Sequence, residues 1–175
     1  MTVVVRNAFW REDPALEPTP RGQILLDHWR RLKAANGGET PNRSALSPHE
    51  LLPILPELTL VALNARIGEY HYRLVGTAVV EMAGRDATGR TLDETLYGPH
   101  LKQLLFPYDL AVDRAQPVVT HSRVLFAERW HAVRNTFVPF ICSGPGVGII
   151  AVHVGRGELL VDPEREGGRY RVLPG

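Results

Sequence analysis

The chain has 175 residues, of which 44% are hydrophobic and 22% charged, so it is long enough to bury a core and too apolar to be disordered throughout. Its formal net charge of +1 argues against a protein built to bind nucleic-acid phosphates or an anionic membrane. A single cysteine, Cys142, excludes an internal disulfide framework and a multi-cysteine zinc site, and fits a cytoplasmic protein.

The N-terminal part is expected to form an irregular leader and then a helix. Residues 1–21 carry three prolines among charges and lack the apolar run of a signal peptide. Residues 22–36 place Leu25, Trp29 and Leu32 at helical spacing, which predicts an amphipathic helix. We expect its apolar stripe to pack either on the chain's own sheet or on a second copy of the chain.

A second, short helix is predicted just before the first strand. Ser47, Pro48 and Glu50 give the pattern of a capping box, with a capping serine, a proline at the first helical position and a glutamate at the third. Pro53 and Pro56 each remove a backbone donor, so the helix should run for only one or two turns.

Two β-prone segments then form an antiparallel hairpin. Residues 58–66 are rich in β-formers, and residues 69–75 alternate clearly, with Tyr70, Tyr72 and Leu74 on one side. The three residues before 69 include a glycine and serve as the turn.

The spacing becomes helical after this hairpin. A helix of about two turns is predicted to place Val79 and Met82 on one face and to end at Gly84. Residues 99–114 predict a longer helix that packs on a sheet, in which Pro107 produces either a kink or a division into two helices.

The last part of the chain returns to the strand pattern. Residues 118–127, 130–140 and 147–154 predict three consecutive antiparallel strands joined by tight turns. A further weak hairpin is expected between residues 158–161 and 169–173. The element order predicts an α+β fold in which a five-stranded antiparallel sheet carries its helices on one face.

Two stretches resemble the PAS domain family, and most closely a bacterial, usually stand-alone PAS-like group of largely unassigned role. The first is Trp29, Arg30 and Arg31 followed by PNRSALSPHELLPILPELTLV, and the second is YHYRLVGTAVVEMAGRDATGRTLDE at residues 70–94. Together they cover roughly a third of the chain. Ala45 and Ser47 replace acidic residues common in the family, which argues against a carboxylate partner for Arg43 in this loop.

The resemblance implies a domain organisation and a role. We expect a leader at 1–21, an N-terminal helical extension at 22–57, a PAS-like core at 58–155 and a C-terminal tail at 156–175. It also implies a sensory or interaction module without catalytic activity, which has a cavity between its sheet and helices and signals to a partner protein.

Six side chains on the predicted elements share the property that they can face one such cavity. They are Tyr72, Leu74, Met82, Leu104, Tyr108 and Phe137. Apolar walls with a few tyrosine hydroxyls are typical of a small-molecule pocket, although the same residues also suit a plain core. The sequence does not indicate a particular cofactor.

Other chemistries find little support in the sequence. None of the seven histidines forms a pair spaced to hold one metal ion, although His71, His121 and His153 lie on strands that could meet in space. A haem would need a helical histidine, for which His100 is the only candidate. Cys142 lacks the helix motif of flavin photochemistry, the GPGVG run at 144–148 precedes a strand instead of a helix, and no serine has a nucleophile-elbow context.

Arg73 and Asp86 are considered as a ligand-binding pair, but Arg73 alternates away from Tyr72, and Asp86 stands in a turn where it can bond the backbone. Two rival functions stay open: a small isomerase or hydrolase on a curved α+β scaffold, and a ligand-free dimerisation module. A homodimer is expected, because the stripe that contains Trp29 offers a contact for a second copy.

Overall fold

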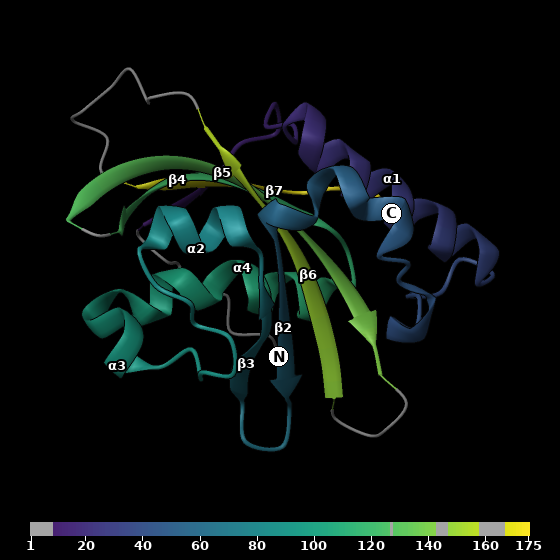
Figure 1. Cartoon of the computed structure of the whole chain (residues 1–175). Helices are drawn as coiled ribbons and strands as arrows, with labels where there is room; N and C mark the ends of the chain where they lie inside the picture. The colour runs from purple at the N-terminus through teal and green to yellow at the C-terminus, as the bar shows by residue number, and fades with distance from the viewer. Residues whose placement is uncertain (1–8, 127, 143–146, 158–166) are drawn as a thin grey trace, which may run out of the picture.

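The computed structural model of the chain describes residues 9–126, 128–142, 147–157 and 167–175. Within these residues the chain forms a mixed α+β fold around a seven-stranded sheet in the order β1-β7-β4-β5-β6-β2-β3 (Figure 1). Successive residues of the central strands are buried, so these strands carry core side chains on both faces of the sheet.

The strands of the described residues, in chain order, are β1 (Trp10–Glu12), β2 (Leu58–Asn64), β3 (Glu69–Val75), β4 (Val118–Phe126), β5 (Arg129–Ile141), β6 (Val147–Arg156) and β7 (Gly168–Val172). The α-helices are α1 (Pro20–Ala35), α2 (Thr77–Ala83), α3 (Glu94–Tyr97) and α4 (Leu101–Arg114). Three 3-10 segments accompany them, namely η1 (Arg43–Ala45), η2 (His49–Glu57) and η3 (Gly98–His100).

The centre of the sheet follows the predicted strands, but the predicted count of five is wrong. β2 lies between β3 and β6, and β5 lies between β4 and β6, and all of these pairs are antiparallel. The two additional strands are β1, inside the predicted irregular leader, and β7, which pairs with β4 and runs parallel to β1. β1 is short and largely polar, so it shows too little alternation to be predicted, whereas β7 matches the half of the weak hairpin predicted at residues 169–173, which was not counted in the sheet. Residues 158–161, the other half of the predicted C-terminal hairpin, lie outside the described residues.

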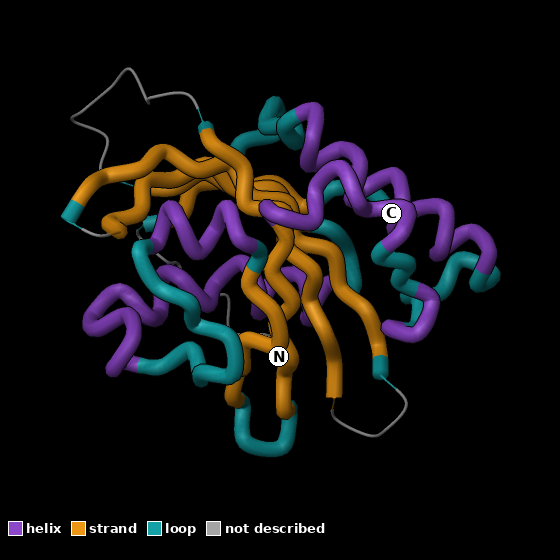
Figure 2. Tube along the Cα trace, in the orientation of Figure 1, coloured by secondary structure: helices purple, strands orange, loops and turns teal. Residues whose placement is uncertain are grey.

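The helices α2 and α4 share one face of the sheet, but the N-terminal helix α1, which was predicted as an addition to this core, covers the opposite face, so the helices do not all lie on one side (Figures 1 and 2). Val118 and Phe137 pack in one core cluster with α4, whereas their neighbours Val119 and Val138 pack in a second cluster with Trp29 of α1. Adjacent residues of a strand point to opposite faces, so helices cover both sides of the sheet.

Helix α1 begins slightly earlier than predicted. The Thr19 hydroxyl accepts a hydrogen bond of 3.0 Å from the Gly22 N–H, and Pro20 occupies the first turn. The Trp29 side chain is fully buried, and its indole N–H donates to the Pro139 carbonyl at 2.6 Å. The apolar stripe therefore packs on the chain's own sheet, which was one of the two expected alternatives.

The capping box predicted for the second helix does not form. Pro48 stands at the cap position without a side-chain bond, and η2 continues for nine residues through both of its prolines. Glu50, the expected capping residue, instead accepts a 2.8 Å hydrogen bond from Arg31 and lies 3.1 Å from the Nδ1 atom of the buried His28. The bond from Arg31 holds the pKa of Glu50 below its ordinary value.

A second glutamate, Glu57, forms similar contacts with an arginine and a histidine at the C-terminal end of η2. Glu57 accepts a 2.8 Å hydrogen bond from Arg21 of α1 and lies 2.6 Å from the Nε2 atom of His153 on β6. Burial alone would raise the pKa of Glu57, but the bonds from Arg21 and His153 hold it below its ordinary value. Burial lowers the pKa of His153, although the Glu57 carboxylate opposes that effect. These two sets of contacts join η2 to α1 and to the sheet.

Helix α4 is continuous across Pro107, so the predicted alternative of two separate helices is wrong. Proline has no N–H to donate to the carbonyl four residues earlier, which here belongs to Gln103. The indole N–H of Trp10 donates to that carbonyl at 2.9 Å, and the Trp10 ring stacks on Phe106 with 5.8 Å between the ring centroids. Strand β1 thus satisfies the acceptor that Pro107 leaves free.

Candidate functional site

A cavity of about 80 Å³ lies between the α4 face of the sheet and the helices α2 and α4. Its apolar wall includes valines from four strands and side chains from α2, α4 and the loop after α2: Val75, Val124, Val133, Val152, Val154, Val79, Met82, Ala83, Ala87 and Leu104. Its polar wall consists of Thr59, Tyr72, Arg85, Tyr97, Tyr108 and Asn135. An apolar wall with a few polar groups is typical of a small-molecule site.

Four of the six residues predicted to face one cavity do line it, and two do not. The four are Tyr72, Met82, Leu104 and Tyr108, which come from β3, α2 and α4. The helical spacing and the β3 alternation therefore brought most of the expected side chains together. Leu74 and Phe137 lie elsewhere.

The side chain of Leu74 is 43% exposed and lies on the face of the sheet opposite the cavity. The prediction that it lines the cavity is therefore wrong. Val61 of β2 pairs with Tyr72, whereas the residue before Val61 pairs with Leu74, which leaves Arg73 as an extra residue in β3. Such a β-bulge reverses the alternation of the side chains beyond it. Consequently Val75, and not Leu74, lines the cavity.

Phe137 lies behind the cavity wall. Its ring packs edge-on against that of Tyr108, with 5.0 Å between the centroids and an interplanar angle of 84°. Its side chain is buried, but it is not one of the residues that line the space. Phe137 therefore holds Tyr108 in position from behind.

Tyrosine hydroxyls give the cavity a neutral polar side. The hydroxyl of Tyr72 hydrogen-bonds that of Tyr97, and Tyr108 lies close enough to influence the titration of Tyr72. Burial raises the pKa of all three tyrosines. They therefore stay protonated at neutral pH and offer hydrogen bonds without charge.

Two further polar side chains on the cavity wall have buried oxygen atoms without a hydrogen-bond partner among the described residues. They are Thr59, through Oγ1, and Asn135, through Oδ1. Thr59 pairs across the sheet with Val75 and Val152, and Asn135 pairs with Val154, all of which line the cavity, so both point to that face. The oxygen and nitrogen of the Asn135 amide are interchangeable by rotation, so it can present either group.

Arg85 is the charged residue of the described wall. It follows Gly84, whose positive φ of 71° ends α2 and turns the chain. Its guanidinium donates to the Leu96 carbonyl at 2.9 Å and lies 5.9 Å from the centre of the Tyr97 ring. Arg85 is exposed overall, which places it where the cavity meets solvent.

The sequence-based site lacked Thr59, Arg85, Tyr97 and Asn135. Asn135 could have been found, because it is two residues before Phe137 on an alternating strand and so shares its face. Arg85 lies within the glycine-arginine-aspartate turn of the second family-like stretch. Tyr97 belongs to a helix of four residues, which shows no periodic pattern.

The described residues contain no group of three or more metal-ligating side chains that could hold an ion. His71, His121 and His153 lie on β3, β4 and β6, which are not adjacent strands. His100 is exposed and does not line the cavity.

Asp86 has the structural use expected of it, because its carboxylate accepts a 2.9 Å hydrogen bond from the Thr88 N–H. β5 and β6 pair antiparallel, with Ile141 opposite Gly148, as expected if the GPGVG run connects two strands. Residues 143–146 themselves lie outside the described part of the chain. No described helix is long and apolar enough to cross a membrane.

Comparison with known proteins gives the class of the molecule. Residues 18–124 match the PAS domain family, and because this is more than half of the chain, the protein belongs to that family. Members of the family generally serve as sensory or interaction modules.

The chain is also similar to a solved structure. The solved structure of a domain of an HTR-like protein from Haloarcula marismortui ATCC 43049 is similar over 56% of this chain and 97% of its own length, with 15% sequence identity and a TM-score of 0.38. No curated protein matches the chain.

Proposed function

We propose that this PAS domain is a non-catalytic sensor, which binds a small molecule in the cavity between the sheet and the helices α2 and α4 and signals to a partner protein. One observation carries the proposal: Thr59 and Asn135 each bring to the cavity wall a buried oxygen that has no partner among the described residues. Buried polar groups in native proteins are nearly always hydrogen-bonded, so a partner beyond the described residues is expected, and we propose that a bound ligand supplies it.

The size of the cavity limits the ligand. The cavity measures only about 80 Å³. Pockets for drug-sized ligands and cofactors measure about 300–1,000 Å³. The cavity therefore suits a compound of a few heavy atoms, and not haem or flavin.

The chemistry of the wall favours binding over catalysis. Among the described residues that line the cavity there is no carboxylate, imidazole or thiol. The three tyrosines have raised pKa values and are poor bases at neutral pH. This wall gives no acid–base pair for the isomerase or hydrolase alternative.

Helix α2 is the element through which occupancy would be reported. It has seven residues, none of them fully buried, and it packs against η2. η2 is joined to α1 through Glu50 and Glu57. A ligand that binds one position of α2 better than another would therefore change the η2 contact and, through it, α1.

The contact with a partner needs a surface other than the Trp29 stripe. That stripe is buried under the chain's own sheet, so it offers no face to a second copy. The large apolar side chains that are exposed in the described residues are Leu52, Ile67, Leu74, Trp130 and Ile141.

The proposal is tested by NMR titration of the full chain with three small probes that share a short alkyl chain, namely 1-propanol, propionamide and propionate. At least one is expected to shift the amide signals of cavity residues. Met82→Trp should abolish the shifts, because Met82 lines the cavity and a larger ring fills it. Leu74→Trp on the outer face is the matched control and should bind like the wild type. The absence of shifts with all three probes, or their persistence in a folded Met82→Trp variant, overturns the proposal.

A further inference from the structure

We infer that the ligand is a short-chain monocarboxylate, whose carboxylate binds Arg85 at the mouth of the cavity while its alkyl chain lies among the valines. This inference rests on the proposed function and names the chemical class of its ligand. Two observations support it: Arg85 carries the only formal charge on the described wall, and most of the other lining side chains are apolar.

Arg85 has N–H donors that form no hydrogen bond among the described residues. A guanidinium carries five N–H donors in a planar fork, and the structure shows one hydrogen bond from it, to the Leu96 carbonyl. Its contact with the Tyr97 ring fixes one face of the guanidinium and leaves its edge available. A carboxylate matches that edge with two parallel hydrogen bonds.

No carboxylate of the described residues forms an ion pair with Arg85, unlike several other arginines of the chain. Arg21 and Arg31 pair with glutamates of η2, and Arg169 and Arg171 pair with acidic residues before α1. Of the acidic residues close to Arg85 along the chain, Glu81 forms no ion pair with it among the described residues, and Asp86 and Asp93 are otherwise engaged.

Asp86 and Asp93 bond the backbone of their own turns. Asp86 accepts a hydrogen bond from the Thr88 N–H, and Asp93 caps α3 by accepting from the N–H groups of Thr95 and Leu96. Hydrogen bonds from the side chains of Thr88 and Thr95, joined by these N–H bonds, lower the pKa of Asp86 and Asp93 respectively below the ordinary value. The positive charge of Arg85 at the cavity is therefore open to an external anion.

The interior of the cavity selects a short apolar chain with one charged end. Its deeper wall includes the buried Val133 and Val152, which would contact methylene groups. The Asn135 amide, turned to present its NH2 group, adds a second donor on the wall. A cavity of about 80 Å³, well below the size of a cofactor pocket, favours a short chain.

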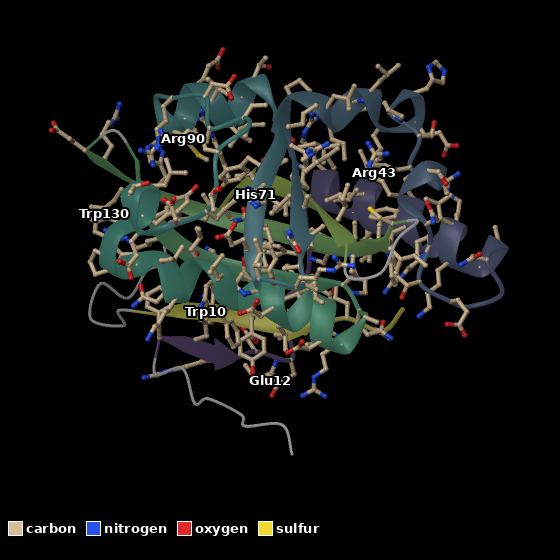
Figure 3. The ribbon with its side chains drawn as sticks, turned by 90° about the horizontal axis from the view of Figure 1, so that it is seen from below. Trp10, Glu12, Arg43, His71, Arg90 and Trp130 are labelled. Carbon is tan, nitrogen blue, oxygen red and sulfur yellow. The ribbon has the colours of Figure 1, made fainter. Side chains whose placement is uncertain are left out.

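The test compares propionate with its neutral isostere propionamide and with the smaller neutral 1-propanol, by titration of the full chain at constant ionic strength. We expect propionate to bind at least tenfold more tightly than propionamide, because charge-assisted hydrogen bonds are the stronger ones. Arg85→Met should remove this preference while neutral probes still bind. Arg90→Met is the matched control, because Arg90 is exposed on the same turn and does not line the cavity (Figure 3).

The outcomes separate this inference from the proposed function. If propionamide or propanol binds as tightly as propionate, or if Arg85→Met keeps the full preference, the carboxylate assignment is overturned and the cavity remains a binding site. If no probe binds, the proposed function fails as well. A loss of preference in Arg90→Met equal to that in Arg85→Met would show a general surface effect of charge, and would also overturn the inference.

Discussion

The hydrogen bond from Trp10 to α4 can be tested by a double-mutant cycle. Trp10→Phe keeps an aromatic ring that can stack on Phe106 but removes the indole N–H, so the Gln103 carbonyl loses its donor. A partly buried acceptor left without a partner costs about 1 kcal/mol of unfolding free energy. For a chain of this size that corresponds to a fall in Tm of roughly 2–4 °C.

Pro107→Ala supplies the second arm of the cycle. Alanine at this position restores a backbone N–H four residues after Gln103, so the carbonyl no longer needs Trp10. The cost of Trp10→Phe should therefore shrink in the Pro107→Ala background, with a coupling free energy of about 1 kcal/mol.

The assay is urea denaturation followed by far-ultraviolet circular dichroism, with the slope m required to stay constant across the four proteins. Trp130→Phe is the control, because Trp130 is 58% exposed at the end of the β4–β5 hairpin and should change the unfolding free energy by less than about 0.5 kcal/mol (Figure 3). An equal cost of Trp10→Phe in both backgrounds, with a coupling below about 0.3 kcal/mol, would refute the reasoning.

Three further predictions concern the sheet and η2. Val75→Glu should destabilise the fold by about 2 kcal/mol or more, whereas Leu74→Glu should cost less than about 0.5 kcal/mol; the reverse order in denaturation would contradict the bulge in β3. Gly76→Ala should cost at least about 2 kcal/mol by the same assay, because its Cβ would overlap backbone carbonyl groups of η2, and a neutral result would disprove that close approach. Burial lowers the pKa of His153 below the ordinary histidine value of 6.5. When the pH is lowered through 6.5, the unfolded chain therefore binds more protons than the folded one. The free energy of unfolding then decreases as the pH decreases, by at most about 1.4 kcal/mol per pH unit. His153→Gln should flatten this acid dependence and the exposed His49→Gln should not; identical slopes for both variants would count against the assignment.

The cavity residues on β3 show what the alternation of side chains along a strand can and cannot predict. It placed Tyr72 inside correctly, because alternation fixes which residues of an unbroken strand share a face. It misplaced Leu74, because a single extra residue in β3 leaves no mark on the hydrophobic pattern yet reverses the faces beyond it. The four missed polar residues come from β2, β5, α3 and the loop after α2, and no local pattern relates them.

Local sequence by itself determined most of the elements of this protein. The β2–β3 hairpin, the strands β4 to β6 and the helices α1, α2 and α4 follow from periodicities of two and 3.6 residues and from glycine and proline signals, all of which act within a few residues. The match to the PAS family agrees with the two stretches that resembled it.

Only the tertiary structure decided which other elements pack against each face of these strands and helices. Strands whose two faces are both apolar can be covered on either side, and only the folded chain shows α1 on one side and α4 on the other. Trp10 and Gln103 are 93 positions apart, so the bond that lets Pro107 sit inside α4 is invisible to any local window. The same holds for Arg85, whose charge faces a cavity only because residues distant in sequence close around it. Local propensity is a short-range property, whereas the partner of a polar group is set by long-range packing.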